Sequence, residues 1–474
     1  MKKILIIVRS TIHYSHCSSI IDEIKKDNNL IKLVFMNDNK ENDFNVIHSY
    51  RVKNSESGEK VLIQKDKTTN KEEVLLKENK NLKIIKGVGR KDKWIWLLQK
   101  LRETLTFISF IRREDNSAFF ENQKRYVPSL ILNINKILLL RKLLCSKITF
   151  NILKKIHNLI PSSRNIKSFL QEVNPDLVLI IGGNWPSSAD KFSSEIDYIK
   201  ASKQKNIPSV IQVVSWDNLT ARGLYHYEPD IMLAWNKDHY KEAVKIHGIS
   251  KNKVKIIGSP FMDKWFNKEK NIASKKEFFK SINLDQNKPL VTYLGSSKNI
   301  TTKESKIAEK IHLHLEKMGI QLIIRPHSAN SYQFKNISKN IPVIPKLGNL
   351  PDTVESKKLM IATLKYSVAT IGVNTTAMID SIILQTPSIA ITKNGLANGQ
   401  KMTTHFEKIF QQGIFISKDT EESCAKEIQD IINNGINKKS KNKMELFIKE
   451  FCRPLGKNIS AGSQGLSEIK KLLN

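Results

Sequence analysis

Three short polar segments in the second half of the chain carry groups that can bind a phosphate. Each follows an apolar run of strand length, and they are the segments 295–298, 325–328 and 374–376. Hydroxyls, a guanidinium, an imidazole and the free N–H groups at a helix start all donate hydrogen bonds to anions. Because parallel strands end along one edge of their sheet, we expect these segments to converge on one phosphate. The candidate groups belong to Ser296, Ser297, Arg325, His327, Asn374, Thr375 and Thr376.

The segment that begins at Asn374 has a second interpretation. Asn374 and the two threonines after it are residue types that cap helices, and the apolar pattern from Ala377 to Leu384 predicts a helix there. Asp380 lies about one turn into that helix, where its carboxylate could reach a ribose hydroxyl. None of the three segments is a P-loop or a dinucleotide-binding glycine motif. The convergence of three such segments favours phosphate binding over capping alone.

The first half of the chain offers candidates for proton transfer. Asp217 follows the apolar run 208–214, and a carboxylate at a strand end could deprotonate a hydroxyl. An aspartate followed by an asparagine is also typical of a simple turn. His13, in the loop after the first apolar run, is a candidate base or ligand, although surface histidines often have no role. On the phosphate side, His327 is the second catalytic candidate.

Three residues next to Asp217 are predicted to contact an acceptor or a sugar. Trp216 could stack on a sugar ring, although a tryptophan in the core is an equally good interpretation. Arg222 could hold an anionic group, and Asn218 is the third predicted contact.

Apolar runs of strand length alternate with helix-like segments from residue 171 onward, which predicts an α/β fold with doubly wound sheets. The charged, non-periodic segment 265–288 predicts a domain boundary. We expect one domain over residues 1–268, a second over 285–450, and a C-terminal helix in 451–474 that packs back on the first. Residues 37–80 are polar and rich in lysine, which predicts irregular hairpins or a mobile excursion outside the core.

Composition restricts the class of protein. A chain of 474 residues is long enough for two or three domains. Its four cysteines show neither metal-ligand nor redox spacing, which favours a reducing compartment and argues against structural zinc. The apolar N-terminal run is too short for a signal peptide, and no run approaches the roughly 18 residues of a membrane span. We therefore expect a soluble, cytoplasmic protein.

The net charge of +32 has more than one interpretation. The lysines occur along the whole chain, which is consistent with a bias in composition. Attraction to an anionic membrane is the next interpretation, and specific nucleic-acid binding is not expected because no recognition motif appears. Residues 91–160 predict helices that are apolar on one side and basic on the other. Such helices could pack on a sheet or lie on an anionic bilayer, the latter best at Trp94 and Trp96.

Five stretches in residues 171–415 carry a resemblance to a known family. They are SWDNLTARG at 215–223, AWNKDHYKEAVKIHGISKNKVKIIGSPFMDKW at 234–265, IIRPHS at 323–328, GVNTTAMIDSIILQTPSIAI at 372–391 and TTHF at 403–406. This half of the chain resembles GT-B-type glycosyltransferases of the capsule and surface-polysaccharide group, which is related in fold to non-hydrolysing UDP-N-acetylglucosamine 2-epimerase. The resemblance implies two Rossmann-like domains that face each other across a cleft, the second holding a nucleotide donor. It also implies that Arg325, His327, Thr375 and Thr376 contact donor phosphate and that Asp380 binds ribose.

The predicted function is therefore transfer of a sugar from a nucleotide-sugar donor to a surface-polysaccharide or lipid-linked acceptor. No metal or other cofactor is expected, because fixed positive groups and a helix start can stabilise the leaving phosphate. A nucleotide-sugar 2-epimerase of the same fold is an alternative. A basic protein that binds a membrane or polyanion without catalysis is another.

Overall fold

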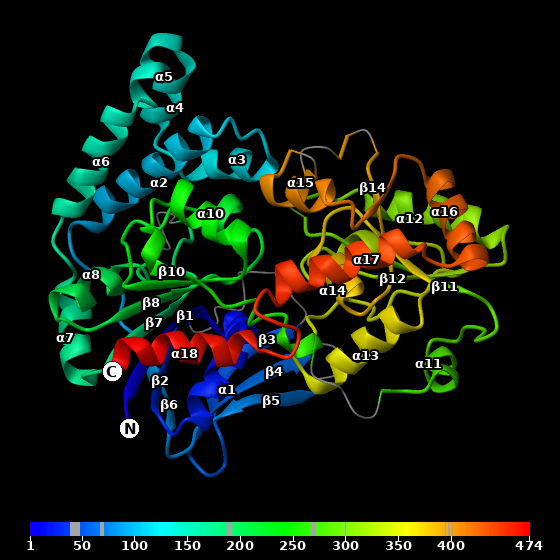
Figure 1. The fold of residues 1–474 in the computed structure, drawn as a ribbon, viewed down its shortest axis with the longest axis horizontal. Helices are drawn as coiled ribbons and strands as arrows, with labels where there is room; N and C mark the ends of the chain where they lie inside the picture. Colours follow the sequence, from blue (N-terminus) through cyan, green and yellow to red (C-terminus); the bar gives the residue numbers. More distant parts are fainter. Residues whose placement is uncertain are drawn as a thin grey trace.

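The computed structural model describes residues 1–37, 48–66, 71–186, 192–266, 272–298, 300–393, 395–396, 399–400 and 402–474. In Figure 1 the chain forms two lobes, the first built from the blue-to-green part of the chain and the second from the yellow and orange part. Parts of the predicted polar excursion, 38–47 and 67–70, lie outside the described residues, as does residue 268 at the predicted end of the first domain.

The first lobe contains a seven-stranded sheet whose described pairs are all parallel, in the order β10-β9-β8-β7-β1-β2-β6. Alternate residues of β1 face opposite layers: Ile4 and Ile6 pack with α1 and α18, whereas Leu5 and Ile7 pack with α7 and α8. Burial on both faces explains why these strands are continuously apolar. The strands are β1 (Lys3–Ser10), β2 (Leu30–Asn37), β6 (Leu82–Lys86), β7 (Leu177–Ile181), β8 (Ser209–Gln212), β9 (Ile231–Ala234) and β10 (Val254–Ile256). The helices of this lobe outside the basic region 91–160 are η1 (Thr11–His16), α1 (Ser18–Lys26), α7 (Arg164–Val173), α8 (Asp197–Gln204), α9 (Asn218–Ala221), α10 (Lys237–Lys245), η3 (Lys251–Lys253) and η4 (Asp263–Trp265).

The lysine-rich region after β2 is more regular than its composition predicts. It forms a three-stranded antiparallel sheet of β3 (His48–Asn54), β4 (Lys60–Asp66) and β5 (Glu72–Lys77). Leu62 and Leu76 are buried in the same apolar cluster as β1 and α1. The prediction that this region lies outside the core is therefore wrong for the described strands. The prediction failed because lysines are frequent in this region and only a few apolar side chains anchor the strands to the core.

The basic region 91–160 is helical, as predicted, and its parts are buried to very different extents. The long helix α2 is buried nearly all round from Leu101 to Ile111. The later helices place many apolar side chains in solvent and project from the first lobe, with α5 outermost (Figure 1). The helices are α2 (Ile95–Arg112), α3 (Ala118–Gln123), η2 (Lys124–Tyr126), α4 (Ser129–Lys136), α5 (Leu138–Leu144) and α6 (Lys147–Leu159).

The second lobe contains a five-stranded parallel sheet in the order β12-β11-β13-β14-β15. One face packs on α12 and α16 and the other on α13 and α14, so this lobe is also doubly wound. The strands are β11 (Leu290–Leu294), β12 (Gln321–Arg325), β13 (Ala369–Gly372), β14 (Ser388–Ile391) and β15 (Ile416–Lys418). The helices are α12 (Glu304–Glu316), η5 (Ser331–Phe334), α13 (Val354–Lys365), α14 (Thr376–Ile383), α15 (Thr404–Gln411), α16 (Glu421–Asn434) and α17 (Lys438–Phe447).

Two further segments connect the lobes. Within the predicted bridge 265–288, helix α11 (Lys275–Ser281) places Phe278 and Phe279 against Leu290 and Ile323 of the second sheet. The chain then returns to the first lobe through a π-helical turn, η7 (Ile448–Cys452), and helix α18 (Ala461–Leu473), which packs on α1 (Figure 1).

Candidate active site

Both sheets reverse their strand order at one point, and such points are where α/β sheets bind ligands. In the first sheet the reversal lies between β1 and β7, and in the second it lies between β11 and β13. The segments after β1, β11 and β13 contain about half of the predicted site residues, and most of the others lie at the end of β12 or after β8, which are neighbouring strands.

The register of the second sheet brings the three predicted phosphate segments together. Leu294, the last residue of β11, pairs with Arg325 on one side and Gly372 on the other. The three loops that follow are therefore neighbours. The backbone N–H of Asn374 donates to the Ser296 hydroxyl at 3.2 Å, which joins two of them directly.

Arg325 and His327 keep donor groups free at this edge. Arg325 is 5% exposed and donates to the Asn349 side chain at 2.7 Å, while its second terminal nitrogen, Nη1, is buried without a described partner. Burial lowers the pKa of Arg325 to about 10, so it remains charged at neutral pH. Burial also lowers the pKa of His327 to about 4, and its Nδ1 accepts from the Ala329 N–H at 3.1 Å. The proton of the neutral ring therefore lies on Nε2, which is available to a ligand.

Helix α14 begins without a side-chain cap. Thr375 occupies the N-cap position in an extended conformation, but its hydroxyl makes no capping hydrogen bond. The Asn374 side chain donates to the Gly399 carbonyl at 2.6 Å, so it does not cap the helix either. The Thr376 hydroxyl accepts from the Trp216 indole of the first lobe at 3.1 Å. The capping interpretation is thus not seen here, and the helix start can accept an anion.

Two predicted residues of the second lobe are already engaged. Asp380 is 4% exposed and accepts from the Trp265 indole at 2.8 Å; burial raises its pKa to about 6, although Lys264 and Arg325 oppose the shift. Its ribose contact remains a prediction. Ser296 is fully buried, and its hydroxyl and N–H hold the loop in place, whereas Ser297 is partly exposed beside it.

The opposite edge, in the first lobe, gathers aromatic and basic side chains. The His13 ring lies 4.8 Å from that of Trp185, and the Arg222 guanidinium lies 4.9 Å from the same indole. Ser10 and His13 share a 2.8 Å hydrogen bond. Burial lowers the pKa of His13 well below its usual value, with help from the charges of Arg9 and Arg222. The imidazole is therefore neutral at neutral pH, and its surroundings disfavour the protonated form.

Asp217 lies at the end of the loop after β8, between the two lobes. Burial raises its pKa, but Arg222, His405 and the Ser215 hydroxyl outweigh that effect and hold the pKa below the usual value. Asp217 is therefore a carboxylate at neutral pH. Its neighbour Trp216 is 7% exposed and meets the edge of the His405 ring at 4.7 Å.

The predicted sugar contacts of Asn218 and Trp216 are not supported by these positions. Asn218 is fully buried, where it donates to the Asn184 side chain at 2.9 Å and accepts from the Tyr225 hydroxyl at 2.9 Å. The indole N–H of Trp216 donates to the Thr376 hydroxyl. A buried polar group needs such partners, so both residues hold the loop that carries Asp217.

Sequence reasoning missed three residues of this site: His405, Trp185 and Glu304. His405, at the start of α15, interacts with Asp217 across the lobes, and its pKa is lowered to about 4 by burial. Its stretch was part of the family resemblance, which was the available signal. Glu304 is fully buried, accepts from the Ser296 N–H at 2.9 Å, and has its pKa raised to about 7 by burial. Glu304 lies in a charged segment outside the stretches that carry the resemblance, so the sequence did not indicate its role.

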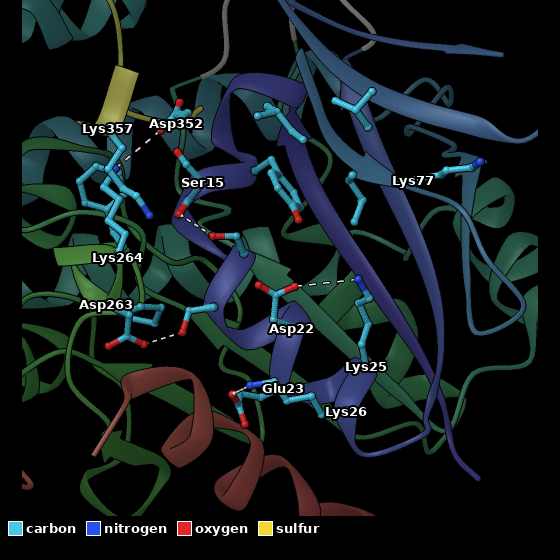
Figure 2. Close-up of a pocket in the computed structure, with 18 of the residues that line it drawn as sticks. Ser15, Asp22, Glu23, Lys25, Lys26, Lys77, Asp263, Lys264, Asp352 and Lys357 are labelled. Atoms are coloured by element: carbon cyan, nitrogen blue, oxygen red, sulfur yellow. Dashed lines mark hydrogen bonds and ion pairs between the residues drawn. The ribbon is translucent and has the colours of Figure 1, made fainter. Parts of the chain in front are cut away.

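A cavity of about 960 Å³ lies beside this site and is not lined by the strand-end donors. It runs along α1 towards β5 and the start of α13, and Figure 2 shows Lys264 and Asp352 paired on one side and Asp22 and Lys25 on the other. Because acids and bases line it together, it has less attraction for phosphate than the second-lobe edge.

Two searches of the described ranges gave no result. No group of three or more His, Cys, Asp or Glu residues there is placed to hold a metal ion. In the same part of the chain, no helix is both long and apolar enough to cross a membrane.

Comparison with known proteins identifies the fold. The structure superposes on a UDP-N-acetylglucosamine 2-epimerase from Methanocaldococcus jannaschii with a TM-score of 0.51 and 13% identity, covering 99% of both chains. A Listeria monocytogenes protein assigned to the same activity gives a TM-score of 0.53 and 10% identity, covering 99% of this chain and 96% of that one. The chain has the GT-B fold. The predicted pair of Rossmann-like domains is confirmed.

A sequence relative extends the comparison to transferases. A UDP-N-acetylglucosamine–N-acetylmuramyl-(pentapeptide) pyrophosphoryl-undecaprenol N-acetylglucosamine transferase from Finegoldia magna is 23% identical over 321 residues, which covers 65% of this chain and 79% of that protein. No protein-family model matches the chain. The GT-B chain thus resembles both a transferase in sequence and epimerases in fold.

Proposed function

We propose that this GT-B protein is a glycosyltransferase that moves a sugar from a nucleotide-sugar donor to a lipid-linked or surface-polysaccharide acceptor. One observation carries the proposal. At the edge of the second sheet, hydrogen-bond donors from adjacent strand ends have no described acceptor: Nη1 of Arg325, Nε2 of His327 and the uncapped start of α14. Such donors stabilise the negative charge that develops on a departing nucleotide phosphate.

The two edges take different parts in the proposed reaction. Arg325, His327, Thr375 and Thr376 bind the phosphates, and the bond between the sugar and the phosphate oxygen breaks as they take up the charge. Asp217 accepts the proton of the acceptor hydroxyl, whose oxygen forms the new bond to the sugar. Arg222 and the Ser215 hydroxyl keep Asp217 ionised for that step. His13 and Arg222 border the space for the acceptor.

The relatives supply the substrate class to test first. The Finegoldia magna protein is named for N-acetylglucosamine transfer from UDP-N-acetylglucosamine to a pyrophosphoryl-undecaprenol acceptor. We propose a UDP-sugar donor and a lipid-linked acceptor for this chain as well. A role in capsule or lipopolysaccharide synthesis, in the cytoplasm and in contact with an anionic membrane through residues 91–160, belongs to the same proposal. Metal independence is also part of it, because Arg325 and the α14 start supply fixed positive charge.

An epimerase is the second candidate. The observation in its favour is a shared fold that covers 99% of this chain. The two functions differ in a single requirement, because an epimerase changes the donor sugar when no acceptor is present.

The test incubates the protein with UDP-N-acetylglucosamine, with and without an undecaprenyl-pyrophosphoryl sugar, and follows the products by NMR and mass spectrometry. Transfer predicts UDP release and a heavier acceptor only when both are present. Inversion at C2 of the sugar without acceptor would establish the epimerase instead. No change in any UDP-, CDP- or GDP-sugar, with or without acceptor, would overturn the enzymatic proposal.

A further inference from the structure

The helices α4–α6 expose an unusual number of apolar side chains. Ten leucines and isoleucines between residues 130 and 159 are at least 40% exposed, and Leu139 and Leu159 reach 76% and 81%. The helices that carry them contact one another, and exposed apolar side chains gathered on neighbouring helices mark an interaction site. The ten are Leu130, Ile137, Leu138, Leu139, Leu140, Leu143, Ile148, Ile152, Ile156 and Leu159, and we call this surface the apolar arm.

The apolar arm is held in place from beneath. Ile131 and Leu132 of α4 pack on Phe107 and Ile111 of α2, which is itself buried. Leu153 of α6 packs in a second cluster that contains Leu98 and Leu101 of α2. The inner side of the arm therefore belongs to the fold, while its outer side has no described partner. Figure 1 shows the arm projecting from the first lobe, with α5 at its end.

The charge of the arm has one sign. Residues 129–160 contain six lysines and arginines and no aspartate or glutamate. Basic side chains next to exposed leucines are typical of segments that lie in the interface of an anionic bilayer, because the cations reach the headgroups while the apolar groups enter the acyl region. The six are Lys136, Arg141, Lys142, Lys147, Lys154 and Lys155.

A basic cavity of about 380 Å³ opens between α2, α6 and the end of α10. Arg112, Arg113, Lys147, Lys154 and Lys245 line it, and none of the described lining residues is an aspartate or glutamate. Arg113 is engaged with the Thr220 carbonyl and Asp115, whereas the other four form no ion pair with the described residues. By contrast, acids and bases share the walls of the larger cavity on α1. Four unpaired cations in one cavity are complementary to a phosphate.

We infer that the apolar arm and this basic cavity together form a docking surface for an anionic phospholipid bilayer, with a lipid phosphate in the cavity and the arm in the acyl region. Charge complementarity selects this occupant. A second copy of the chain would place one basic arm against another, which opposes association. A nucleic acid would leave the ten exposed aliphatic side chains unburied, because its surface is a charged phosphate backbone. The inference rests on the membrane contact named in the proposed function and assigns it to particular residues, and its test needs neither nucleotide nor acceptor.

The experiment is flotation of the full-length protein with vesicles of phosphatidylglycerol and phosphatidylcholine, and with vesicles of phosphatidylcholine alone. The wild type is expected to float with the anionic vesicles only, and less so as salt is raised. The cavity variant K147Q/K154Q/K245Q is expected to bind roughly a hundredfold more weakly, at about fivefold for each cation near an anionic surface. The arm variant L138N/L139N is expected to lose at least tenfold, because two exposed leucines no longer enter the acyl region.

A matched control removes the same charge elsewhere. K438Q/K439Q/K441Q changes three lysines of α17 in the second lobe, and it should bind vesicles within about twofold of the wild type. All the substituted side chains are at least partly exposed, so unchanged melting temperatures will show that the variants fold. Because no sugar transfer is measured, a failure of this inference is separate from a failure of the proposed function.

Four outcomes would overturn the inference. The wild type could fail to float with anionic vesicles. The α17 control could lose as much binding as the cavity variant, which would make net charge the cause. Sedimentation could instead show a dimer that L138N/L139N dissociates, which would assign the arm to a second copy. Binding of free inorganic phosphate without flotation would likewise contradict a bilayer site.

Discussion

The two strand edges that face each other between the lobes differ in how their polar groups are used. In the first lobe most polar groups pair with one another: Asn184 with Asn218, Asp217 with Ser215, and His13 with Ser10. In the second lobe Arg325 and His327 keep donor atoms without described partners, and α14 starts without a cap.

This difference indicates that the second-lobe edge binds a charged ligand. Unsatisfied buried donors cost stability, so a fold retains them where a ligand supplies the missing acceptor. The paired edge instead fixes the shape of a loop that presents Asp217. Arg222 and Trp185 are exceptions in the first lobe, since the Nε of Arg222 and the indole nitrogen of Trp185 have no described partner, and we place both on the acceptor side.

Asp217→Asn should have the largest effect, because it removes the proposed base from the first-lobe edge and leaves the second-lobe edge unchanged. If the first edge supplies the base, sugar transfer should fall by about 10²–10⁴-fold, the usual contribution of general base catalysis. Nucleotide affinity should stay within about threefold, because phosphate is held on the other edge. Turnover measured with UDP-sugar and acceptor, beside UDP titration, checks both. Asp430→Asn, on the exposed side of α16, is the control, and equal losses in the two variants would refute the assignment.

His327→Ala and Arg325→Gln test the opposite edge. Each removes a donor to phosphate, and hydrogen bonds to charged groups contribute about 1.5–3 kcal/mol, so UDP should bind roughly 10–100-fold more weakly. Calorimetric titration measures the change, and His314→Ala on α12 is the matched control. Unaltered UDP affinity in both variants would show that the phosphate lies elsewhere.

Glu304 makes the second edge sensitive to pH. Burial raises its folded pKa to about 7, above the usual 4.5, so the folded state favours the proton. Its contribution to stability is complete below pH 4.5, declines as pH rises, and is lost above about pH 7. Chemical denaturation at several pH values should show the wild type losing up to about 3 kcal/mol relative to Glu304→Gln across that window. Parallel pH profiles for the two proteins would contradict the role given to Glu304.

Trp216→Phe tests the link between the edges and should have the smallest effect. It removes the indole N–H that bonds Thr376, which should lower the free energy of unfolding by about 1 kcal/mol. Because the hydroxyl of Thr376 is then free, UDP affinity should not fall by more than about threefold. A large loss of UDP affinity would instead place Trp216 in direct contact with the nucleotide.

Much of this arrangement could be predicted because apolar runs mark buried parallel strands and the polar residues after them mark the sheet edge. That logic placed Arg325, His327 and Thr375 on adjacent strand ends, as the register of β11 shows. The alternation of apolar runs and the charged segment 265–288 predicted the second domain, and the resemblance to GT-B proteins implied that the two domains are both Rossmann-like.

Other features depend on contacts that no local pattern reveals. Asn218 looks like any exposed turn residue until Asn184, from a distant loop, is placed beside it. His405 reaches Asp217 from another lobe, and nothing in its neighbours requires that. The β3–β5 sheet was hidden because its solvent face is rich in lysine, although Leu62 and Leu76 anchor it to the core.

The most direct test of a phosphate site at the edge of the second sheet is a thermal-shift panel of the wild type with UDP, CDP, GDP and CMP, each with and without magnesium. A nucleotide at about a hundred times its dissociation constant should stabilise the fold by about 2.7 kcal/mol. We expect a shift with one nucleotide, UDP first, that is independent of magnesium and disappears in Arg325→Gln. No shift with any nucleotide, or a shift that Arg325→Gln leaves intact, would contradict a phosphate site at the edge of the second sheet.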